Sequence, residues 1–541
     1  MRILLERVAA VSKRLSRRQG FALVGVGAAA LLGLALGEAP LLDPDEARHA
    51  EIAREMLVSG RVLEPLINFE PYHHKPSLLY VLVGVCYRLF GVGETAARLV
   101  PALLSWLTIV TVYGYGARTS VAVGLVASSL LAACGFFVHV GRFTNFDALL
   151  TATMTAAVVS FATWLDRRER GRMLLAAYLF VGIAVLAKGP AALIMVAGPV
   201  LFLIVRGQVS VRELRPFAGA VLTGAVVAAW AVPVWLQAPQ YLVDFVWIHN
   251  IRRYLWPADI FHPEPFWFFV PIVFGALLPW SLLLPHAFGA ALRRKGSDAF
   301  LAAYCVWVLL FFSLSTGKLA TYVLPAFPAA AVVVARWLVD AAGATATRGR
   351  ALVSVAAGLC ASLPFAAAIA AHLESPGQEA IALVFVPVAV AAATVLVAGR
   401  SRMPTTIEPL LVLCAGMIAT VLTFELAAPT ALGRFTSDRD LATAALEHGR
   451  PDRMVAFGVM PYSFLFYTTW EMVHGEDEDA YRAAFDEAGS VLVLTKDGRV
   501  PVLRGIIGDV ELREIARNRR HVLLLRPAAT PLPSGLPSGR P

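Results

Sequence analysis

The sequence contains little charge for its length. Only 16% of its 541 residues are Asp, Glu, Lys or Arg, and 58% are hydrophobic, whereas soluble domains usually carry about a quarter charged residues. An apolar chain this long exceeds the ~250–300 residues at which a soluble core stops growing, and it lacks the high charge of a disordered protein. What remains is a polytopic membrane protein. We therefore attribute the net charge of +9 to cytoplasmic loops rather than to nucleic-acid binding.

Cysteine is also scarce, and its positions show no metal-type spacing. The five residues lie in apolar runs: Cys86, Cys134, Cys305, Cys360 and Cys414. An odd number scattered in this way indicates ordinary packing rather than a disulfide framework. The N-terminal apolar stretch, 21–42, is followed by no clear A-x-A cleavage site, so we interpret it as a retained first span.

Apolar runs near the ~20 residues needed to cross a bilayer occur thirteen times. They lie near 21–42, 97–117, 119–140, 146–165, 173–187, 189–205, 217–237, 266–287, 299–314, 319–339, 351–372, 379–398 and 408–427. Two of these runs, 173–187 and 299–314, are short, which leaves counts of twelve and eleven open.

The basic residues follow the positive-inside rule if the N-terminus is cytoplasmic. The cytoplasmic connectors then hold six bases in the first twenty residues, followed by Arg118, Arg167, Arg168, Arg170, Arg172, Arg206, Arg212, Arg215, Arg293, Arg294, Lys295, Arg348, Arg350, Arg400 and Arg402. The short outer connectors hold only Arg142, Lys188, Arg252, Arg253 and Lys318. The sequence therefore predicts a cytoplasmic N-terminus and an extracytoplasmic C-terminal region.

Two long regions lie outside the spans: the first outer loop, 43–96, and the tail after 427. The tail contains strand-like runs at 454–457, 491–494 and 522–525, alternating with helical patterns at 438–448 and 477–488. We therefore expect a transmembrane domain over 1–427 and a small α/β domain over 428–527. The remaining residues, 528–541, are rich in Pro, Gly and Ser and are predicted to be disordered.

The first outer loop opens with DPDEARHAEIAREMLVSG, residues 43–60. We expect a helix lying along the membrane surface, capped by Asp43 with Glu46 as its capping-box partner and ended by Gly60. Its polar face is expected to consist of Arg48, Glu51, Arg54 and Glu55.

Two acids, Asp45 and Glu46, fall in the first turn of this helix. One interpretation is that they interact with the helix dipole. The other is functional, because a helix directly after the first span can present its N-terminus to a membrane cavity, where a carboxylate is costly without a partner or a role.

A second motif, FEPYHHKPSLLY, occupies 69–80. Pro71 and Pro76 enclose a Tyr-His-His-Lys sequence and force a turn, after which 77–90 can form a second interfacial helix. A hydrated turn near lipid phosphates is the alternative to a functional one.

Together the two motifs resemble the aminoarabinose-transferase and protein O-mannosyltransferase class of integral-membrane glycosyltransferases. That class carries a D-E-x-R-Y-A-E-I-x-R-E-M pattern and an E-K-P turn in its first outer loop. The resemblance implies the GT-C fold: an all-α polytopic membrane protein with about 13 transmembrane helices, interfacial helices and a small extracytoplasmic α/β domain. It also implies an inverting enzyme of the bacterial cytoplasmic membrane that moves a sugar from a polyprenyl-phosphate donor, such as undecaprenyl phosphate, to an acceptor hydroxyl at the outer face.

The sequence departs from this class at two histidines. His49 stands where the class has Tyr, and His74 stands where it has the Glu of the E-K-P turn. That Glu is associated with divalent-metal binding, and His74 could also ligate zinc. A divalent metal, Zn or Mg/Mn, held by His74 and His249, is therefore an expected cofactor.

The implied reaction requires a base for the acceptor hydroxyl and cations for the departing phosphate. We assign Asp45 as the leading base candidate, with Glu46 and Asp147 as supporting acids. The donor phosphate is assigned to Lys75, Arg253 and Tyr322, with Arg48, Lys188 and Lys318 as secondary candidates. Individually, Lys188 could snorkel, Arg252 and Arg253 could touch anionic lipid, and Tyr322 could belong to an interfacial belt.

Other functions are weighed against this one. A lipid-linked-sugar transporter or flippase usually shows internal repeats and charges buried mid-membrane, whereas the polar residues here cluster at one face. A scaffold protein would not require Asp45, Lys75, Arg142 and Asp147 together at that face. Among enzymes, a protein O-mannosyltransferase is the nearest alternative to transfer onto lipid A or another glycolipid or cell-envelope glycan. The expected partners are the donor lipid, the acceptor and membrane lipids, without nucleic acid.

Overall fold

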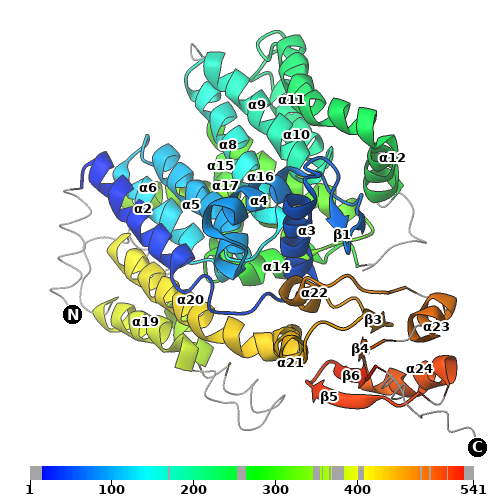
Figure 1. The fold of residues 1–541 in the computed structure, drawn as a ribbon. Coiled ribbons are helices and arrows are strands. Elements are labelled where there is room, and N and C mark those ends of the chain that lie inside the picture. Colours follow the sequence, from blue (N-terminus) through cyan, green and yellow to red (C-terminus); the bar gives the residue numbers. More distant parts are fainter. Residues whose placement is uncertain are drawn as a thin grey trace, which may run out of the picture.

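The computed structural model describes residues 15–168, 171–252, 264–344, 354–355, 357–364, 367, 383–399, 407–475, 478–486, 489–508 and 510–528. Helices dominate this part of the chain, and a small domain with a four-stranded sheet lies at one side of the helical bundle, near α3 (Asp45–Ser59) (Figure 1).

The helices of the bundle follow the predicted spans closely. They are α2 (Arg17–Gly33), α5 (Glu94–Gly116), α6 (Val121–Ala132), α7 (Gly135–Gly141), α8 (Phe146–Asp166), α9 (Gly171–Lys188), α10 (Ala191–Val205), α11 (Pro216–Gln237), α14 (Phe269–Ala276), η3 (Trp280–Leu283), α15 (Leu284–Arg293), α16 (Ser297–Leu314), η4 (Ala320–Ala326), α17 (Phe327–Ala344), α19 (Val386–Gly399) and α20 (Ile407–Thr436). Shorter elements between them are α3 (Asp45–Ser59), α4 (Leu78–Phe90), α12 (Pro239–Val243) and η1 (Asp244–Arg252).

Among the described residues, seven helical segments are apolar and long enough to cross a membrane, and two bent helix pairs bring the number to nine. The chain is therefore a multi-pass membrane protein. The predicted total of thirteen is larger because α2, α10 and α19 are shorter than a full span. Most of the predicted span 351–372 lies outside the described residues.

Three predicted spans differ from the observed helices. The span expected over 119–140 is bent by 72° between α6 and α7, and the one over 266–287 is bent by 110° after α14. Pro279 lies at the second break, where it can donate no helical N–H bond. The first predicted span is also too long, because α2 ends at Gly33 and the chain from there to Leu42 is irregular.

Arg98 on α5 anchors this irregular segment. Its guanidinium donates to both carboxylate oxygens of Glu46, at 2.7 and 2.9 Å. It also donates to the carbonyls of Leu36, Ala39 and Pro40. Both charged side chains are buried, where only such complete pairing offsets the cost of desolvation. The ion pair therefore fixes the first turn of α3 against the bundle.

The capping box predicted for α3 is wrong. The helix begins at Asp45 without a side-chain cap, and the Asp43 carboxylate instead accepts hydrogen bonds from Ser463, far along the chain. Glu46 accepts the N–H of Leu42 rather than that of Asp43. Gly60 ends the helix as predicted, with the positive φ of 72° that glycine tolerates best.

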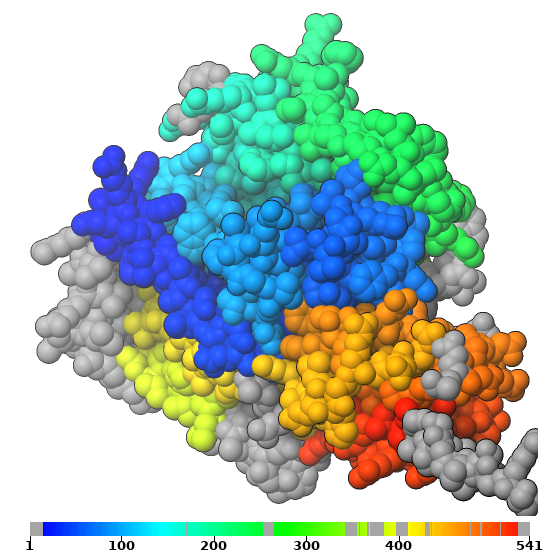
Figure 2. Space-filling model, viewed as in Figure 1, coloured from blue at the N-terminus to red at the C-terminus, as the bar shows by residue number. Residues whose placement is uncertain are grey.

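The C-terminal domain contains a four-stranded sheet of order β3-β4-β6-β5. Its elements are α21 (Arg439–His448), β3 (Arg453–Phe457), α22 (Tyr462–Thr468), α23 (Glu478–Asp486), β4 (Val491–Thr495), η6 (Asp497–Arg499), α24 (Val500–Ile507), β5 (Arg513–Arg517) and β6 (Val522–Arg526). β3 pairs with β4 in parallel, and the other two pairings are antiparallel. The space-filling view shows this domain, orange and red, against the blue N-terminal part of the chain (Figure 2).

Helices cover both faces of this sheet. Met454 and Ala456 pack in a cluster with Phe464 of α22, whereas the alternate residues Val455 and Phe457 pack in a cluster with Tyr481 of α23. Burial on both faces explains why the predicted strands read as continuous apolar runs. The three predicted strands and both helices are confirmed, but β5, with the polar sequence REIAR, was not predicted, because edge strands carry charge.

The polar face predicted for α3 is also wrong, since Glu51, Arg54 and Glu55 are all buried. Arg54 donates two hydrogen bonds of 2.6 Å to Glu51, so the opposite charges of these two buried side chains neutralise each other. Burial, followed by the charge of Glu51, raises the pKa of Glu55 to about 8.

A short hairpin, β1 (Leu66–Ile67) and β2 (Glu70–Pro71), covers this carboxyl group. Its turn residues Asn68 and Phe69 each donate a backbone N–H to Glu55 at 2.8 Å. The Asn68 side chain exchanges two hydrogen bonds with the backbone of Met472. The hairpin therefore joins α3 to the C-terminal domain.

We predict that Arg98→Met lowers the free energy of unfolding by about 3–5 kcal/mol, because it leaves Glu46 buried and unpaired. Thermal and denaturant unfolding in detergent micelles measures the loss. Arg88→Met, on the exposed end of α4, is the matched control and should change little. The double variant Arg98→Met with Glu46→Gln should recover part of the stability; no recovery would contradict the buried-pair explanation.

We also predict a pH effect from Glu55. Between pH values of about 4.5 and about 8 the folded state retains a proton that the unfolded state releases, so this group makes stability decline as pH rises. Glu55→Gln should flatten that decline in unfolding midpoints measured from about pH 5 to about pH 9. The exposed Glu447→Gln should leave the profile unchanged. A wild-type profile without this decline would refute the prediction.

Candidate functional site

A cavity of about 100 Å³ brings together residues from several of the predicted outer connectors. Its lining comprises Lys75, Leu150, Lys188, Ala191, Ala192, His249, Asn250, Phe311, Phe312, Ser315, Gly317 and Tyr322. Three of the six predicted phosphate residues, Lys75, Lys188 and Tyr322, therefore share one hollow although they are distant in sequence. Two ammonium groups and a phenol form a suitable set for a phosphate.

Lys188 occupies the centre of this set. It lies at the end of α9 and forms an ion pair with Asp147 in the first turn of α8. Its ammonium group also lies 4.6 Å from the centre of the Tyr322 ring. Asp147 therefore compensates and orients a cation at the cavity, which is a different role from the supporting acid predicted from the sequence.

The Pro71–Pro76 turn contributes Lys75 to the lining. Tyr241 on α12 donates its hydroxyl to the carbonyl of Lys75 at 2.5 Å, which fixes the backbone of the turn. His73 binds Asp244 at 2.8 Å and stacks on Tyr241, so it belongs to this support. Lys75 is thereby held at the cavity by its main chain.

His74 lies beside His249, with ring centres 4.0 Å apart, and stacks on Tyr72. Within the described ranges no group of three His, Cys, Asp or Glu side chains could hold a metal ion. Two imidazoles fall short of the four ligands of a closed zinc site. The divalent metal therefore stays a prediction.

Asp45 and Arg48 form an ion pair at the start of α3, where Asp45 is 60% exposed. The Arg48 guanidinium lies over the rings of Tyr72, at 5.9 Å, and Tyr462, at 5.4 Å. Its Nε is buried and makes no hydrogen bond within the described part of the chain. The exposed carboxylate of Asp45 therefore lies beside a guanidinium whose Nε–H has no acceptor within the described residues.

His49, one turn after Asp45, connects this pair to the cavity. Burial lowers the pKa of His49 well below its usual value, and the positive charges of Arg48, Lys75 and Lys188 lower it further. A neutral imidazole adds no repulsion among these three cations. The His49 ring also contacts Tyr80 and Phe146, the residue before Asp147. Both halves of the candidate site therefore meet around His49.

Two predicted site residues, Glu46 and Lys318, do not join this group. Glu46 is committed to its buried pair with Arg98. Lys318 is buried and donates to the carbonyl of Glu264 at 2.7 Å, and it does not line the cavity. Arg253 lies outside the described residues. Arg142, named with them in the sequence, is buried in an ion pair with Glu425.

The structure adds residues that the sequence did not single out. Asn250 and Phe312 line the cavity, and Tyr462 of the C-terminal domain covers Arg48. The only indication of Asn250 in the sequence was its position directly after His249. Nothing in the sequence indicated that Tyr462 belongs to the site, because only the folding of the tail brings this residue to α3.

The other end of α8 has a different cavity, of about 390 Å³. Its lining contains Arg118, Arg167, Arg294, Lys295 and Arg336 together with three aspartates. Asp147 and Asp166 lie near opposite ends of α8, about 30 Å apart for a helix of this length. The residues predicted outside and inside are thus separated by roughly one bilayer core.

Comparison with known proteins supports this description. Residues 74–235 match the family model described as dolichyl-phosphate-mannose-protein mannosyltransferase. The undecaprenyl phosphate-alpha-4-amino-4-deoxy-L-arabinose arabinosyl transferase of Erwinia tasmaniensis is 32% identical over 339 residues, 60% of each chain. The corresponding protein of Aeromonas salmonicida is 34% identical over 329 residues, 57% of this chain and 58% of its own. The chain thus spans about three fifths of the length of the relatives it matches.

Solved structures define the fold. The crystal structure of ArnT from Cupriavidus metallidurans bound to undecaprenyl phosphate superposes with a TM-score of 0.82 at 21% identity, covering 93% of this chain and 97% of that one. Its apo state gives a TM-score of 0.83 over 94% and 98%. The chain therefore has the GT-C fold of that protein, and the predicted resemblance to this class of membrane glycosyltransferases is confirmed.

Proposed function

We propose that the protein transfers a sugar from a polyprenyl-phosphate donor to a hydroxyl of a glycolipid such as lipid A, at the outer face of the bacterial cytoplasmic membrane. The observation that carries this proposal is the convergence of Lys75, Lys188 and Tyr322 on one cavity, linked through His49 to the exposed Asp45. The similar proteins of Erwinia tasmaniensis and Aeromonas salmonicida carry the name of such a transferase.

The donor phosphate is assigned to this cavity. As the bond between the sugar C1 and the phosphate oxygen breaks, negative charge builds on the phosphate and is stabilised by the two ammonium groups and the Tyr322 hydroxyl. Apolar side chains such as Leu150, Phe311 and Phe312 complete the lining and exclude water, which strengthens these interactions. The polyprenyl phosphate is the leaving group.

Asp45 is assigned to the acceptor. Its carboxylate is exposed and can accept the proton of the attacking hydroxyl as the new bond to C1 forms. Arg48 forms an ion pair with that carboxylate, and its spare Nε donor can bind the donor phosphate. Attack opposite the departing phosphate inverts the anomeric centre.

The orientation is part of the proposal, with the N-terminus in the cytoplasm and the C-terminal domain outside. Four of the bases assigned to the cytoplasmic connectors line the larger cavity at the Asp166 end of α8, as the positive-inside rule expects; they are Arg118, Arg167, Arg294 and Lys295. The candidate site lies at the other end, on the side of the C-terminal domain.

A protein hydroxyl is the second candidate acceptor, because the matching family model is described as a protein mannosyltransferase. Transfer of labelled sugar in proteoliposomes to lipid A or to a Ser/Thr-rich peptide separates the two acceptors. A flippase would translocate the donor without forming any product in this assay.

We predict that Asp45→Asn reduces transfer by about 10²- to 10⁴-fold, because the amide cannot accept the hydroxyl proton. Product formation in proteoliposomes measures the rate, and the thermal unfolding midpoint confirms folding. Asp479→Asn, on the exposed side of α23, is the matched control. Near-normal turnover of Asp45→Asn would remove this residue from the mechanism.

We predict that Lys75→Met weakens binding of polyprenyl phosphate by about 10- to 150-fold, the value of one charge-assisted hydrogen bond. Lys295→Met removes the same charge at the other end of the bundle and should bind the lipid normally. Microscale thermophoresis in nanodiscs gives both affinities. Equal affinity of the Lys75→Met and wild-type proteins would contradict the phosphate assignment.

A further inference from the structure

Residues just before and at the start of α3 contact the C-terminal domain and α20, the helix leading to it, in addition to Arg98 of the bundle. Asp43 is the centre of these contacts: Oδ1 accepts the backbone N–H of Ser463 at 2.8 Å, and Oδ2 accepts the Ser463 hydroxyl at 2.5 Å. The guanidinium of Arg520 donates to Oδ2 at 2.9 Å. The Asp43 side chain is only 1% exposed.

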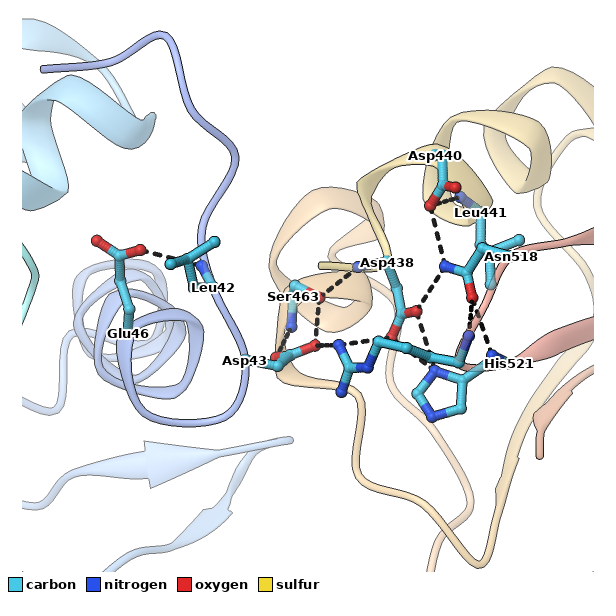
Figure 3. Close-up of polar contacts among 10 residues, drawn as sticks. Leu42, Asp43, Glu46, Asp438, Asp440, Leu441, Ser463, Asn518 and His521 are labelled. Atoms are coloured by element: carbon cyan, nitrogen blue, oxygen red, sulfur yellow. Dashed lines mark hydrogen bonds and ion pairs between the residues drawn. The ribbon is translucent and has the colours of Figure 1, made fainter. Parts of the chain in front are cut away.

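The partners of Asp43 are themselves fixed. Asp438 accepts hydrogen bonds from Asn518, at 3.0 Å, and from His521, at 2.9 Å. Its backbone N–H donates to the Ser463 hydroxyl. Figure 3 shows Asp43 facing Ser463 and Asp438, while Glu46 points away from them toward Leu42. The network thus joins α21, α22 and the β5–β6 turn to one carboxylate in the first outer loop.

Contacts on both sides of Asp43 come from the same part of the chain. The Leu41 N–H donates to the hydroxyl of Tyr467 on α22 at 2.9 Å, and the Asp43 N–H donates to the carbonyl of Thr436 at 2.8 Å. On the other side, Tyr462 contacts Arg48, the ion-pair partner of Asp45. Adjacent residues of α22, Tyr462 and Ser463, therefore hold the groups that flank Asp45.

The ion-pair partner of Asp45 is Arg48, and within the described residues no hydrogen bond or ion pair joins Asp45 to the C-terminal domain. Only Pro44 separates it from Asp43, and the proline ring restricts the backbone φ of that link. A shift of Asp43 is therefore transmitted to Asp45. An error of about 1 Å in the position of a reacting group can cost about 10²-fold in rate.

We infer that Asp43 is a positioning residue, through which Ser463 and Arg520 of the C-terminal domain set the direction of the Asp45 carboxylate. This inference rests on the proposed function. It gives the C-terminal domain a part in sugar transfer: the domain orients the acceptor-side carboxylate and leaves the phosphate cavity, built from the bundle, unchanged.

The first test separates turnover from donor binding. Asp43→Asn keeps the side-chain size but loses the ion pair with Arg520; it should lower kcat by about 10- to 100-fold while the Kd for polyprenyl phosphate stays within about 2-fold. Both are measured in nanodiscs with the full-length chain. An equal loss in donor affinity, or unchanged kcat, would overturn the inference.

Substitutions of two arginines in the C-terminal domain, Arg520 and Arg517, distinguish a loss of positioning from a general loss of stability of that domain. Arg520→Met should reproduce the Asp43→Asn phenotype, and Arg520→Lys should restore most of the turnover because it keeps the charge near Asp43. Arg517→Met removes an arginine paired with Asp497 and Glu514 and should leave kcat unchanged. Equal effects of Arg517→Met and Arg520→Met would indicate general destabilisation of the domain and refute the inference.

A double-mutant cycle tests whether Asp43 acts through Asp45. In the Asp45→Asn background, Asp43→Asn should cost little further activity, because the group that it positions is already disabled. Additive losses would mean that Asp43 acts independently and would overturn the inference.

Hydrogen exchange keeps this inference distinguishable from the proposed function. In Asp43→Asn, the amides of residues 45–49 should exchange faster than in wild type, while those of α8 should not change. Absence of transfer by the wild-type protein with every donor and acceptor would refute the proposed function, yet the exchange result would still decide whether Asp43 holds α3. Unchanged exchange would refute the tether.

Discussion

The end of the bundle that carries the candidate site depends on a buried ion pair, that of Glu46 and Arg98. The guanidinium uses its donors on one carboxylate and three carbonyls, so it converts an irregular stretch after α2 into a defined support for α3. Burying two charges is favourable only when each donor and acceptor is satisfied. Because this condition is met, Asp45, the neighbour of Glu46, can stay exposed while the helix that carries it is rigid.

The charged side chains of the candidate site are also compensated by partners of opposite charge. Lys188 is compensated by Asp147, and Arg48 by Asp45, whereas His49 between them stays neutral. Cations near a low-dielectric region are costly unless paired. Of these paired cations, Lys188 lines the cavity, and Arg48 retains a buried Nε without a hydrogen bond among the described residues. Under the proposed function, the donor phosphate would meet cations that are already paired within the fold.

The sequence predicted the apolar helices and the small sheet domain because periodicity and length are local properties. The motifs at 43–60 and 69–80 also predicted Asp45, Arg48 and Lys75 as neighbours of a common site. Long-range pairings could not be predicted: Glu46 meets a residue 52 positions away, and Asp43 meets one 477 positions away. For the same reason the sequence assigned a capping role to Asp43 and a catalytic role to Glu46. Lys188 and Lys318 looked equivalent as lone outer lysines, and only packing directs one to the cavity and the other to a carbonyl.

The helix α20 runs without interruption from Ile407 to Thr436, about 45 Å at 1.5 Å per residue. Its inner part is apolar enough to cross the bilayer, and the carbonyl at its last residue accepts the N–H of Asp43. A continuous helix of this length is stiff, so a change in the tilt of its membrane-spanning part displaces its C-terminal end. Its tilt responds to bilayer thickness, so the geometry of the first outer loop is mechanically connected to the physical state of the surrounding membrane.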